Sequence, residues 1–189
     1  RRPSARQIES FEAKDLDRLN DLLLPLLKGY CSEKVYTLLG SSSLQCFGGA
    51  GNLKDYPIEQ YVRDQKIDAL YEGTTHIQAL DLLFRKVAKD GGATLQGLLK
   101  QMEATATSAT GGEHCAAAKT RLGQAISDVQ GTFMAAMAKM GESIYHVGLQ
   151  GNRILFSLAE LTIGWLLIRQ AEVAATALEE YLHKRYVGQ

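Results

Sequence analysis

One carboxylate, that of Glu72, lies where it could act as a general base. It belongs to the short segment Tyr71-Glu-Gly-Thr-Thr75, which follows a predicted helix that ends near Leu70 and precedes another. A carboxylate in such a turn often does no more than interact with the free N–H groups and positive end of the next helix. It can also point into a pocket, where loss of hydration raises its pKa towards that of a useful base. The residues alone leave both roles open.

A glycine-rich segment, Gly48-Gly-Ala-Gly51, is the second place where chemistry is conceivable. Glycines let the backbone approach a ligand closely, and successive free N–H groups can hold a phosphate or the edge of a ring. No strand precedes the segment and no Lys-Ser/Thr pair ends it, so it is neither a Rossmann fingerprint nor a P-loop. A helix-ending turn is the other explanation, and the spacing alone favours it.

Metal and nucleic-acid sites have little support in the sequence. His76 is four residues after Glu72, but the carboxylate precedes the helix, and no HExxH or three-ligand pattern occurs, so we expect no metal. The 3 cysteines show no CxxC spacing, which indicates a reducing compartment rather than a disulfide or zinc scaffold. Lys plus Arg and Asp plus Glu both number 21, without a basic block, which argues against a nucleic-acid binder.

The elements that must position these residues are all predicted to be helices. Apolar residues recur at helical spacing over about 16–39, 57–70, 77–87, 93–107, 113–140 and 149–185, with connections at 105–112 and 141–151. Thr74 or Thr75 is a plausible N-cap, and Gly91-Gly92 should end a helix. The predicted fold class is therefore all-α: a helical bundle over residues 1–90, followed by an additional helical extension over residues 91–189.

Apolar side chains mark the faces that these helices should bury. Those predicted to face inward before Gly92 are Ile58, Tyr61, Val62, Ile67, Ile77, Leu80, Leu83, Phe84 and Val87. The longest apolar stretch, Ile154–Ile168, is interrupted by Glu160 and is shorter than the roughly 20 residues that a membrane-spanning helix needs. We therefore expect no membrane span. Because the sequence opens with Arg1 in the middle of a pattern, we also expect it to be a piece of a larger protein.

Two segments together resemble a known family. They are Gln45-Cys-Phe-Gly-Gly-Ala-Gly51 with Asp55-Tyr-Pro-Ile-Glu-Gln-Tyr-Val-Arg-Asp64, and Lys66-Ile-Asp-Ala-Leu-Tyr-Glu-Gly-Thr-Thr-His-Ile-Gln78. In this order and with these gaps they are similar to the C-terminal helical domain of flavin-dependent acyl-CoA dehydrogenases, over about residues 15–88. The part after Gly92, with Gly148-Leu-Gln150 and Ile163–Glu172, is similar to the helical extension of the longer bacterial members.

The resemblance implies an oxidoreductase that converts acyl-CoA to trans-2-enoyl-CoA in fatty-acid β-oxidation, with FAD as cofactor. Glu72 would remove the α-proton of the thioester, the β-carbon would give a hydride to the flavin, and Gly73 would line the substrate site. Thr74, Thr75 and His76 would contact the flavin. The residues implied to contact the adenine–diphosphate part of FAD, in a neighbouring subunit, are Gln45, Cys46, Phe47, Gly48 and Gly49. The implied partners are acyl-CoA, an electron-transfer flavoprotein and a second copy of the chain, in the bacterial cytoplasm.

The resemblance also leaves alternatives open. Some family members carry the base on an earlier helix, so Glu72 is the best candidate within this sequence. His76 stands where the family often has a smaller or uncharged polar residue. The rival to an enzyme is a non-catalytic helical module for oligomerisation or protein interaction, although such a module has no need for a carboxylate in this turn.

We expect the 189-residue chain alone neither to hold FAD tightly nor to turn over acyl-CoA. The reason is that the resemblance assigns most other FAD contacts to a β-domain and to helices outside this sequence. The visible absorbance of the purified isolated chain checks this expectation, and a stoichiometric yellow flavin would contradict it.

Overall fold

The computed structural model describes residues 5–71 and 73–186, with side chains over 13–71 and 73–185. Among these residues every regular element is a helix, which confirms the predicted all-α class. The elements are α1 (Ala5–Thr37), the π-helix η1 (Leu38–Ser43), α2 (Leu44–Cys46), the 3-10 helix η2 (Gly48–Asn52), α3 (Ile58–Lys66), the 3-10 helix η3 (Ile67–Ala69), α4 (Thr75–Leu80), the π-helix η4 (Asp81–Val87), the 3-10 helix η5 (Ala88–Asp90), α5 (Ala93–Thr107), α6 (Gly112–Met140) and α7 (Ile144–Tyr186).

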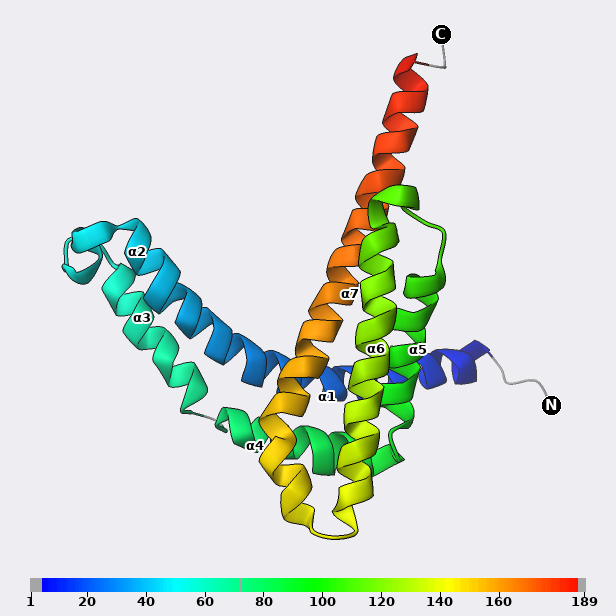
Figure 1. Cartoon of the computed structure of the whole chain (residues 1–189), viewed down its shortest axis with the longest axis horizontal. Coiled ribbons are helices and arrows are strands. Elements are labelled where there is room, and N and C mark those ends of the chain that lie inside the picture. Colours follow the sequence, from blue (N-terminus) through cyan, green and yellow to red (C-terminus); the bar gives the residue numbers. More distant parts are fainter. Residues whose placement is uncertain (1–4, 72, 187–189) are drawn as a thin grey trace.

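The helices form two arms that meet in a V (Figure 1). One arm is the C-terminal part of α1, with α2 at its tip and α3 running back beside it. The other arm is made of α5, α6 and α7, which lie side by side and alternate in direction. α4 lies at the base of the V, where it packs against both α1 and α7. The base is therefore the place where the two halves of the sequence come together.

A single hydrophobic core joins the two halves. Leucines repeat at helical spacing on the inward faces of α1 and α5, as an amphipathic helix requires. The fully buried members of the core include Leu22 from α1, Ala79 and Leu82 from α4 and η4, Leu98 and Met102 from α5, and Ile154, Leu155 and Leu158 from α7. Removal of either half would therefore expose apolar surface of the other.

α7 differs from the sequence-based prediction at its start. The predicted connection over 141–151 is wrong, because only residues 141–143 separate α6 from α7. Gly148 and Gly151 lie inside α7, where a Cβ at Gly151 would come within 3.2 Å of the Cβ of Ala79 in α4. These glycines looked like helix breakers, but their lack of side chains allows two helices to pack closely. The predicted helix over 93–107 is confirmed by α5, and the connection predicted over 105–112 is shorter, with only residues 108–111 between α5 and α6.

α7 is also long and apolar enough, by length and composition, to cross a bilayer. Its 43 residues extend over about 65 Å at the usual helical rise. Of its most apolar stretch of 18 residues, 39% is buried within this chain. Burial against other helices accounts for Ile154, Leu155 and Leu158, which face the core. Leu166, Leu167 and Val173 of the same helix are exposed.

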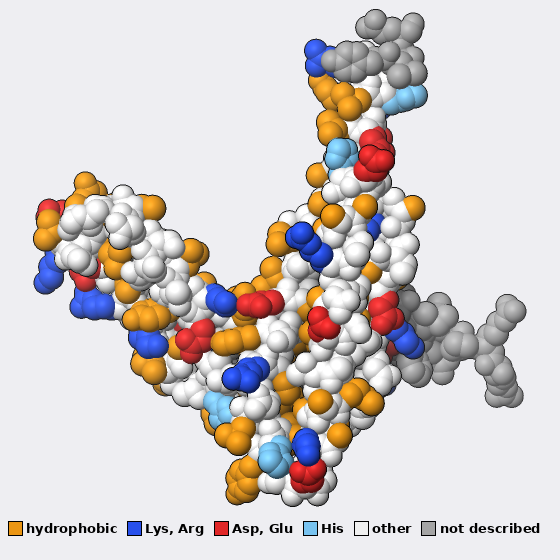
Figure 2. Space-filling model, in the orientation of Figure 1, with side chains coloured by type: hydrophobic (Ala, Val, Ile, Leu, Met, Phe, Trp, Pro, Cys, Tyr) orange, Lys and Arg blue, Asp and Glu red, His pale blue; other side chains and the backbone are white. Residues whose placement is uncertain are grey.

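Some side chains that were predicted to be buried are exposed. Ile58 is buried as predicted, but Tyr61, Ile67 and Ile77 are each more than half exposed. Figure 2 shows hydrophobic side chains at the surface of the arm that α1 and α3 form. The apolar pattern alone could not identify what packs on these side chains. Within the described residues, Tyr61, Ile67 and Ile77 are turned to solvent.

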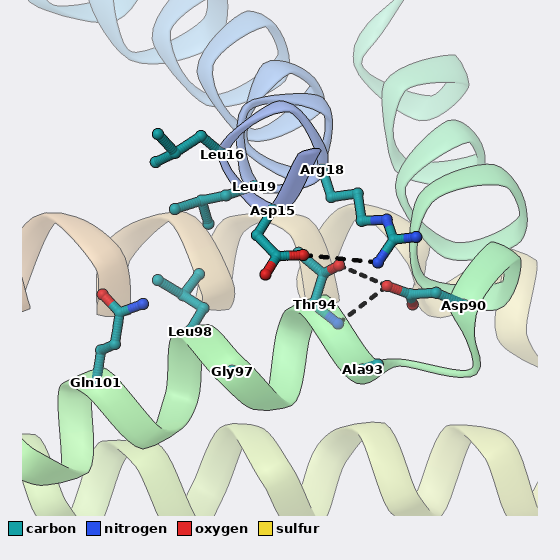
Figure 3. Close-up of a pocket in the computed structure, with 10 residues that line it drawn as sticks. All are labelled: Asp15, Leu16, Arg18, Leu19, Asp90, Ala93, Thr94, Gly97, Leu98 and Gln101. Atoms are coloured by element: carbon teal, nitrogen blue, oxygen red, sulfur yellow. Dashed lines mark hydrogen bonds and ion pairs between the residues drawn. The ribbon is translucent and has the colours of Figure 1, made fainter. Parts of the chain in front are cut away.

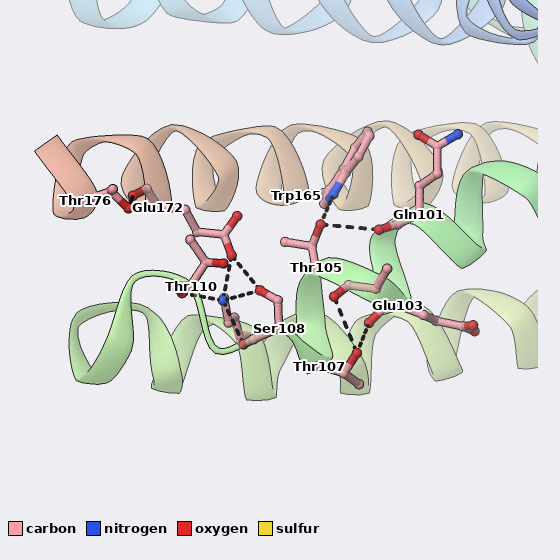
Figure 4. Close-up of polar contacts among 11 residues, drawn as sticks. Gln101, Glu103, Thr105, Thr107, Ser108, Thr110, Trp165, Glu172 and Thr176 are labelled. Carbon is pink, nitrogen blue, oxygen red and sulfur yellow. Dashed lines mark hydrogen bonds and ion pairs between the residues drawn. The ribbon is translucent and has the colours of Figure 1, made fainter.

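A buried ion pair joins the α5–α6 loop to α7 (Figure 4). Lys119 in α6 is only 5% exposed, and its Nζ donates to the carbonyls of Ser108 (3.0 Å) and Thr110 (2.6 Å) and to the carboxylate of Glu172 in α7. The Ser108 hydroxyl also donates to Glu172, at 2.9 Å. Burial raises the pKa of Glu172, but the hydrogen bonds from Lys119 and Ser108 and the charge of Lys119 outweigh it, so the pKa is lowered.

Glu172→Gln is expected to loosen this loop by about 3 kcal/mol, because the Lys119 charge stays buried without its partner. Since the folded pKa of Glu172 is lowered, the pair contributes fully above the unfolded pKa and is lost as pH falls through the folded value. Amide hydrogen exchange of residues 108–111 in the full-length protein measures both effects. The matched control is Glu142→Gln, which breaks an exposed pair with Lys139 and is expected to cost about 1 kcal/mol or less. Equal exchange in the two variants would contradict the prediction.

Candidate active site

The backbone is fixed on both sides of residue 72. On the N-terminal side, the N–H of Tyr71 donates to the carbonyl of Ile67 at 2.8 Å. On the C-terminal side, Gly73 has a φ of +96°, which L side chains rarely adopt, and Thr74 is extended (φ −62°, ψ 165°) before α4 begins. Glu72 itself lies outside the described residues, so its role as a base stays a prediction.

Gly73 is required by space as well as by conformation. A Cβ at this position would lie 2.7 Å from Nε2 of Gln78 and 3.5 Å from Cγ2 of Ile77. The side-chain amide of Gln78 therefore packs directly against the backbone of residue 73. A larger residue at this position would displace the end of the Gln78 side chain, and it would be strained by the φ of +96°.

The three predicted flavin-contact residues at the start of α4 have different surroundings. Thr74 occupies the N-cap position as predicted, but its exposed side chain makes no capping hydrogen bond. Thr75 is buried, and its hydroxyl donates to Oε1 of Glu33 in α1 at 2.7 Å. The ring of His76 is exposed, with Nδ1 3.3 Å from Oδ1 of Asn152 in α7. The start of α4 is thus tied to α1 at one residue and to α7 at the next.

The other predicted cofactor segment, Gln45–Gly49, is an exposed turn at the tip of the first arm (Figure 1). Gln45 and Cys46 belong to α2, and the turn continues into η2. The ring of Phe47 packs against that of Tyr56, with 5.2 Å between centroids, and both rings remain partly exposed. The tip therefore presents an aromatic and glycine surface to whatever lies next to it.

The glycines of this turn serve two different purposes. A Cβ at Gly51 would lie 2.8 Å from the carbonyl oxygen of Leu44, so Gly51 is needed to close the turn. A Cβ at Gly48 or Gly49 would meet nothing within 4 Å. The turn does not need these two glycines for its own packing, although Gly48 has a φ of +56°. Their open backbone can accept the close approach of a ligand.

The two groups of predicted site residues do not meet within one chain. α3 and η3 separate them, so that residues 73–76 lie at the base of the V and residues 45–49 at its tip (Figure 1). This separation agrees with the expectation that the tip contacts a cofactor held mainly by another subunit. That expectation remains a prediction.

Two residues that hold the start of α4, Glu33 and Asn152, were not predicted from the sequence. Glu33 precedes its partner Thr75 by 42 residues, and Asn152 follows its partner His76 by 76. Neither belongs to a motif or a recognisable spacing, because both contacts depend on how α4 packs between two other helices. Gly148 and Gly151, which precede Asn152, could have drawn attention to the second contact, but they suggested a loop instead.

Two grooves of similar size lie away from the predicted site. One of about 510 Å³ lies between the first half of α1 and the start of α5, and its lining includes Leu16, Arg18 and Leu98 (Figure 3). There Asp90 accepts hydrogen bonds from the backbone N–H groups of Gly92 (3.1 Å) and Thr94 (3.0 Å), which caps α5 after the predicted stop at Gly91-Gly92. The other groove, of about 540 Å³, is lined mainly by α5 and α6.

Over the part of the chain that the structure describes, no group of three His, Cys, Asp or Glu side chains could hold a metal ion.

Comparison with known proteins matches nearly the whole sequence to one family. Residues 6–86 match the profile described as "Acyl-CoA dehydrogenase, C-terminal domain", and residues 98–188 match that described as "Acetyl-CoA dehydrogenase C-terminal like". The chain is 44% identical over 181 residues to the broad-specificity linear acyl-CoA dehydrogenase FadE5 of Mycobacterium tuberculosis, which covers 93% of this chain and 30% of that protein. It is 32% identical over 174 residues to 3-methylmercaptopropionyl-CoA dehydrogenase of Ruegeria pomeroyi, covering 87% of this chain and 29% of that protein.

The fold, the Tyr-Glu-Gly-Thr turn and these matches define a helical part of a dehydrogenase. The chain belongs to the acyl-CoA dehydrogenase family and corresponds to its C-terminal part. It spans less than a third of the length of the two relatives named above. The predicted resemblance to this family is thereby confirmed.

Proposed function

We propose that this chain is the C-terminal part of a flavin-dependent enzyme that oxidises acyl-CoA to trans-2-enoyl-CoA in fatty-acid β-oxidation. The observation that carries the proposal is the match of nearly the whole chain to acyl-CoA dehydrogenases, together with the Tyr71-Glu-Gly-Thr74 motif. The residues on either side of Glu72 are consistent with it: the N–H of Tyr71 bonds to Ile67, and Gly73 has a φ of +96° that L side chains rarely adopt. A glycine that the backbone requires beside a carboxylate suits a catalytic turn.

In this proposal Glu72 is the base that takes the α-proton of the acyl thioester. That proton is weakly acidic, so its removal needs a carboxylate that is poorly hydrated and aligned with the α-carbon. The negative charge that develops on the thioester oxygen needs hydrogen-bond donors, and we propose the backbone N–H of residue 72 as one of them. Gly73, which has no side chain, would let the substrate approach that N–H group.

FAD is the cofactor that the family implies, and the described residues fit it. Gly48 and Gly49 at the tip offer an open backbone for its adenine–diphosphate part, and Thr74 at the base has a hydroxyl without a capping bond. When bound, FAD supplies the acceptor for the hydride that leaves the β-carbon. Because the tip and the base are separated in one chain, we propose that Gln45–Gly49 serves the FAD of a second subunit in a homo-oligomer.

The exposed apolar side chains of the first arm support an assembly of this kind. Leu53, Tyr61, Ile67 and Leu70 are each more than half exposed, a surface that usually packs against other protein. We propose that the remainder of the enzyme and a second subunit cover it.

We also propose that the enzyme works in the bacterial cytoplasm and passes its electrons to an electron-transfer flavoprotein. Within the chain, we propose that residues 1–90 form a catalytic bundle and that residues 91–189 form its extension.

The full-length enzyme tests the proposed function directly. Purified with FAD and mixed without oxygen with straight-chain acyl-CoA substrates of several lengths, it should lose its flavin absorbance as trans-2-enoyl-CoA forms in equal amount. Mass spectrometry of the CoA products supplies the second reading. A flavoprotein that no acyl-CoA bleaches, or a protein without flavin, would contradict the proposal and favour a helical interaction module.

A further inference from the structure

The extension packs closely against α4, the helix that follows the predicted base. Gly151 in α7 is buried, and a Cβ there would lie 3.2 Å from the Cβ of Ala79 and 3.7 Å from Cδ1 of Leu83. The contact excludes water, since Ala79 is completely buried. One turn earlier, a Cβ at Gly148 would lie 3.8 Å from Cδ2 of Leu80. At these positions the two helices touch with almost no side chain between them.

We propose that this part of α7 positions α4, and with it the turn that carries Glu72, so that the extension acts as a positioning element of the active site. The proposal rests on the proposed role of Glu72 as the base. It assigns to Gly151 and Asn152 a part in the reaction geometry, although neither would touch the substrate.

The first support is that α4 is held from two sides. α7 meets α1 at Gly29, where a Cβ would lie 3.0 Å from Cδ1 of Leu155, one helical turn beyond Gly151. Four residues after Gly29, on the same face of α1, Glu33 accepts the hydrogen bond of Thr75. The close approach of α7 and α1 therefore sets the width of the space into which α4 fits.

The second support is polar and lies closer to the predicted base. Thr75 is bound to α1 through Glu33, and the next residue, His76, is bound to α7 through Asn152. These ties begin three residues after Glu72 and hold α4 in rotation as well as in distance. A change in the position of α7 would thus move the first turn of α4, because Ala79 is only one helical turn from Thr75.

The size of the expected effect follows from how strictly a proton transfer depends on alignment. A displacement of about 1 Å in a catalytic group can cost about a hundredfold in rate. A Val side chain at position 151 must move α4 or α7 by an amount of this order, since even a Cβ is already tighter than usual against Ala79. The displacement should change how Glu72 meets the α-carbon, and it should change the binding of acyl-CoA much less.

The test is Gly151→Val in the full-length holoenzyme, with Gly164→Val as the matched control. Gly164 lies in the same helix, and a Cβ there would meet nothing within 4 Å. We expect Gly151→Val to lower the rate of flavin reduction about 30-fold to 100-fold with a nearly unchanged KM, and Gly164→Val to leave both close to wild type. Independently of activity, Gly151→Val should raise the hydrogen exchange of the α4 amides and alter the visible flavin spectrum, which the control should not do.

A compensating change makes the test specific. Ala79→Gly removes the Cβ that the new side chain strikes. The double variant should therefore reduce flavin at least about tenfold faster than Gly151→Val alone. Should Gly151→Val not fold, Gly151→Ala carries the same comparison with a smaller expected loss. Equal rates and equal α4 exchange in the variants at 151 and 164 would overturn the proposal, and so would a double variant without recovery. If Glu72→Gln kept its rate while Gly151→Val still disturbed α4, the role of Glu72 would fail, but the packing role of α7 would not.

Discussion

Glu72→Gln in the full-length enzyme should bind acyl-CoA and yet fail to bleach the flavin, with the rate of reduction lowered about a thousandfold or more. The amide has nearly the shape of the carboxylate but cannot accept the α-proton, so it removes general-base catalysis and little else. FAD content, melting temperature and the affinity for a CoA thioester should stay close to wild type. A stopped-flow measurement of flavin absorbance without oxygen gives the rate.

The control for this variant is Glu59→Gln, a carboxylate of α3 that forms an i,i+4 pair with Arg63. It should reduce flavin at the wild-type rate, because a partly exposed pair of this kind contributes little. Bleaching at a normal rate by Glu72→Gln would remove Glu72 from its proposed role. The base would then have to be sought on a helix outside this sequence.

Gly73→Ala should have the second largest effect, a loss of about a hundredfold in flavin reduction together with lower stability. An alanine at a φ of +96° is strained, and its Cβ would also displace the end of the Gln78 side chain, whose Nε2 would lie 2.7 Å away. The turn must relax, and a relaxed turn no longer holds the neighbouring carboxylate in line with the α-carbon. The rate of flavin reduction and the melting temperature, measured on the same preparation, report the two parts.

A matched control separates strain from position. Gly91→Ala carries a comparable backbone cost, since Gly91 has a φ of +63°, but its Cβ would meet nothing within 4 Å. It should lower the melting temperature without slowing flavin reduction. If the two variants lost stability and rate in the same proportion, the loss at Gly73 would be a general effect of destabilisation.

The sequence was sufficient for local features and insufficient for those that depend on a distant partner. Periodic leucines predicted the helices, and Gly91-Gly92 was predicted to end one of them. In the structure both glycines have a positive φ at that position. Gly148 and Gly151 are chemically the same residue type, but they lie within α7, and at Gly151 the close approach of α4 leaves little space for a side chain. Only the packed structure distinguishes a glycine that turns the chain from one that admits a neighbour.

The candidate site shows the same division. The Tyr-Glu-Gly-Thr and Gln-x-x-Gly-Gly motifs drew attention to residues 72–76 and 45–49 without any structure. Glu33 and Asn152 carry no motif, because their roles come from where α1 and α7 happen to cross α4. The exposure of Tyr61 and Ile67 could not be foreseen either, since an apolar stripe is the same whether its partner is the same chain or another.

The shared core has a consequence for how such enzymes can be shortened or recombined. A chain cut after Asp90 would keep the Gln-x-x-Gly-Gly and Tyr-Glu-Gly-Thr motifs, but it would turn Ala79, Leu82 and Leu83 towards water, where they now meet α7 and its neighbours. Such a truncated gene product would invite aggregation instead of yielding a smaller catalyst. Swapping the extension between relatives should therefore succeed only when the residues at the crossing of α4 and α7 travel together as a set.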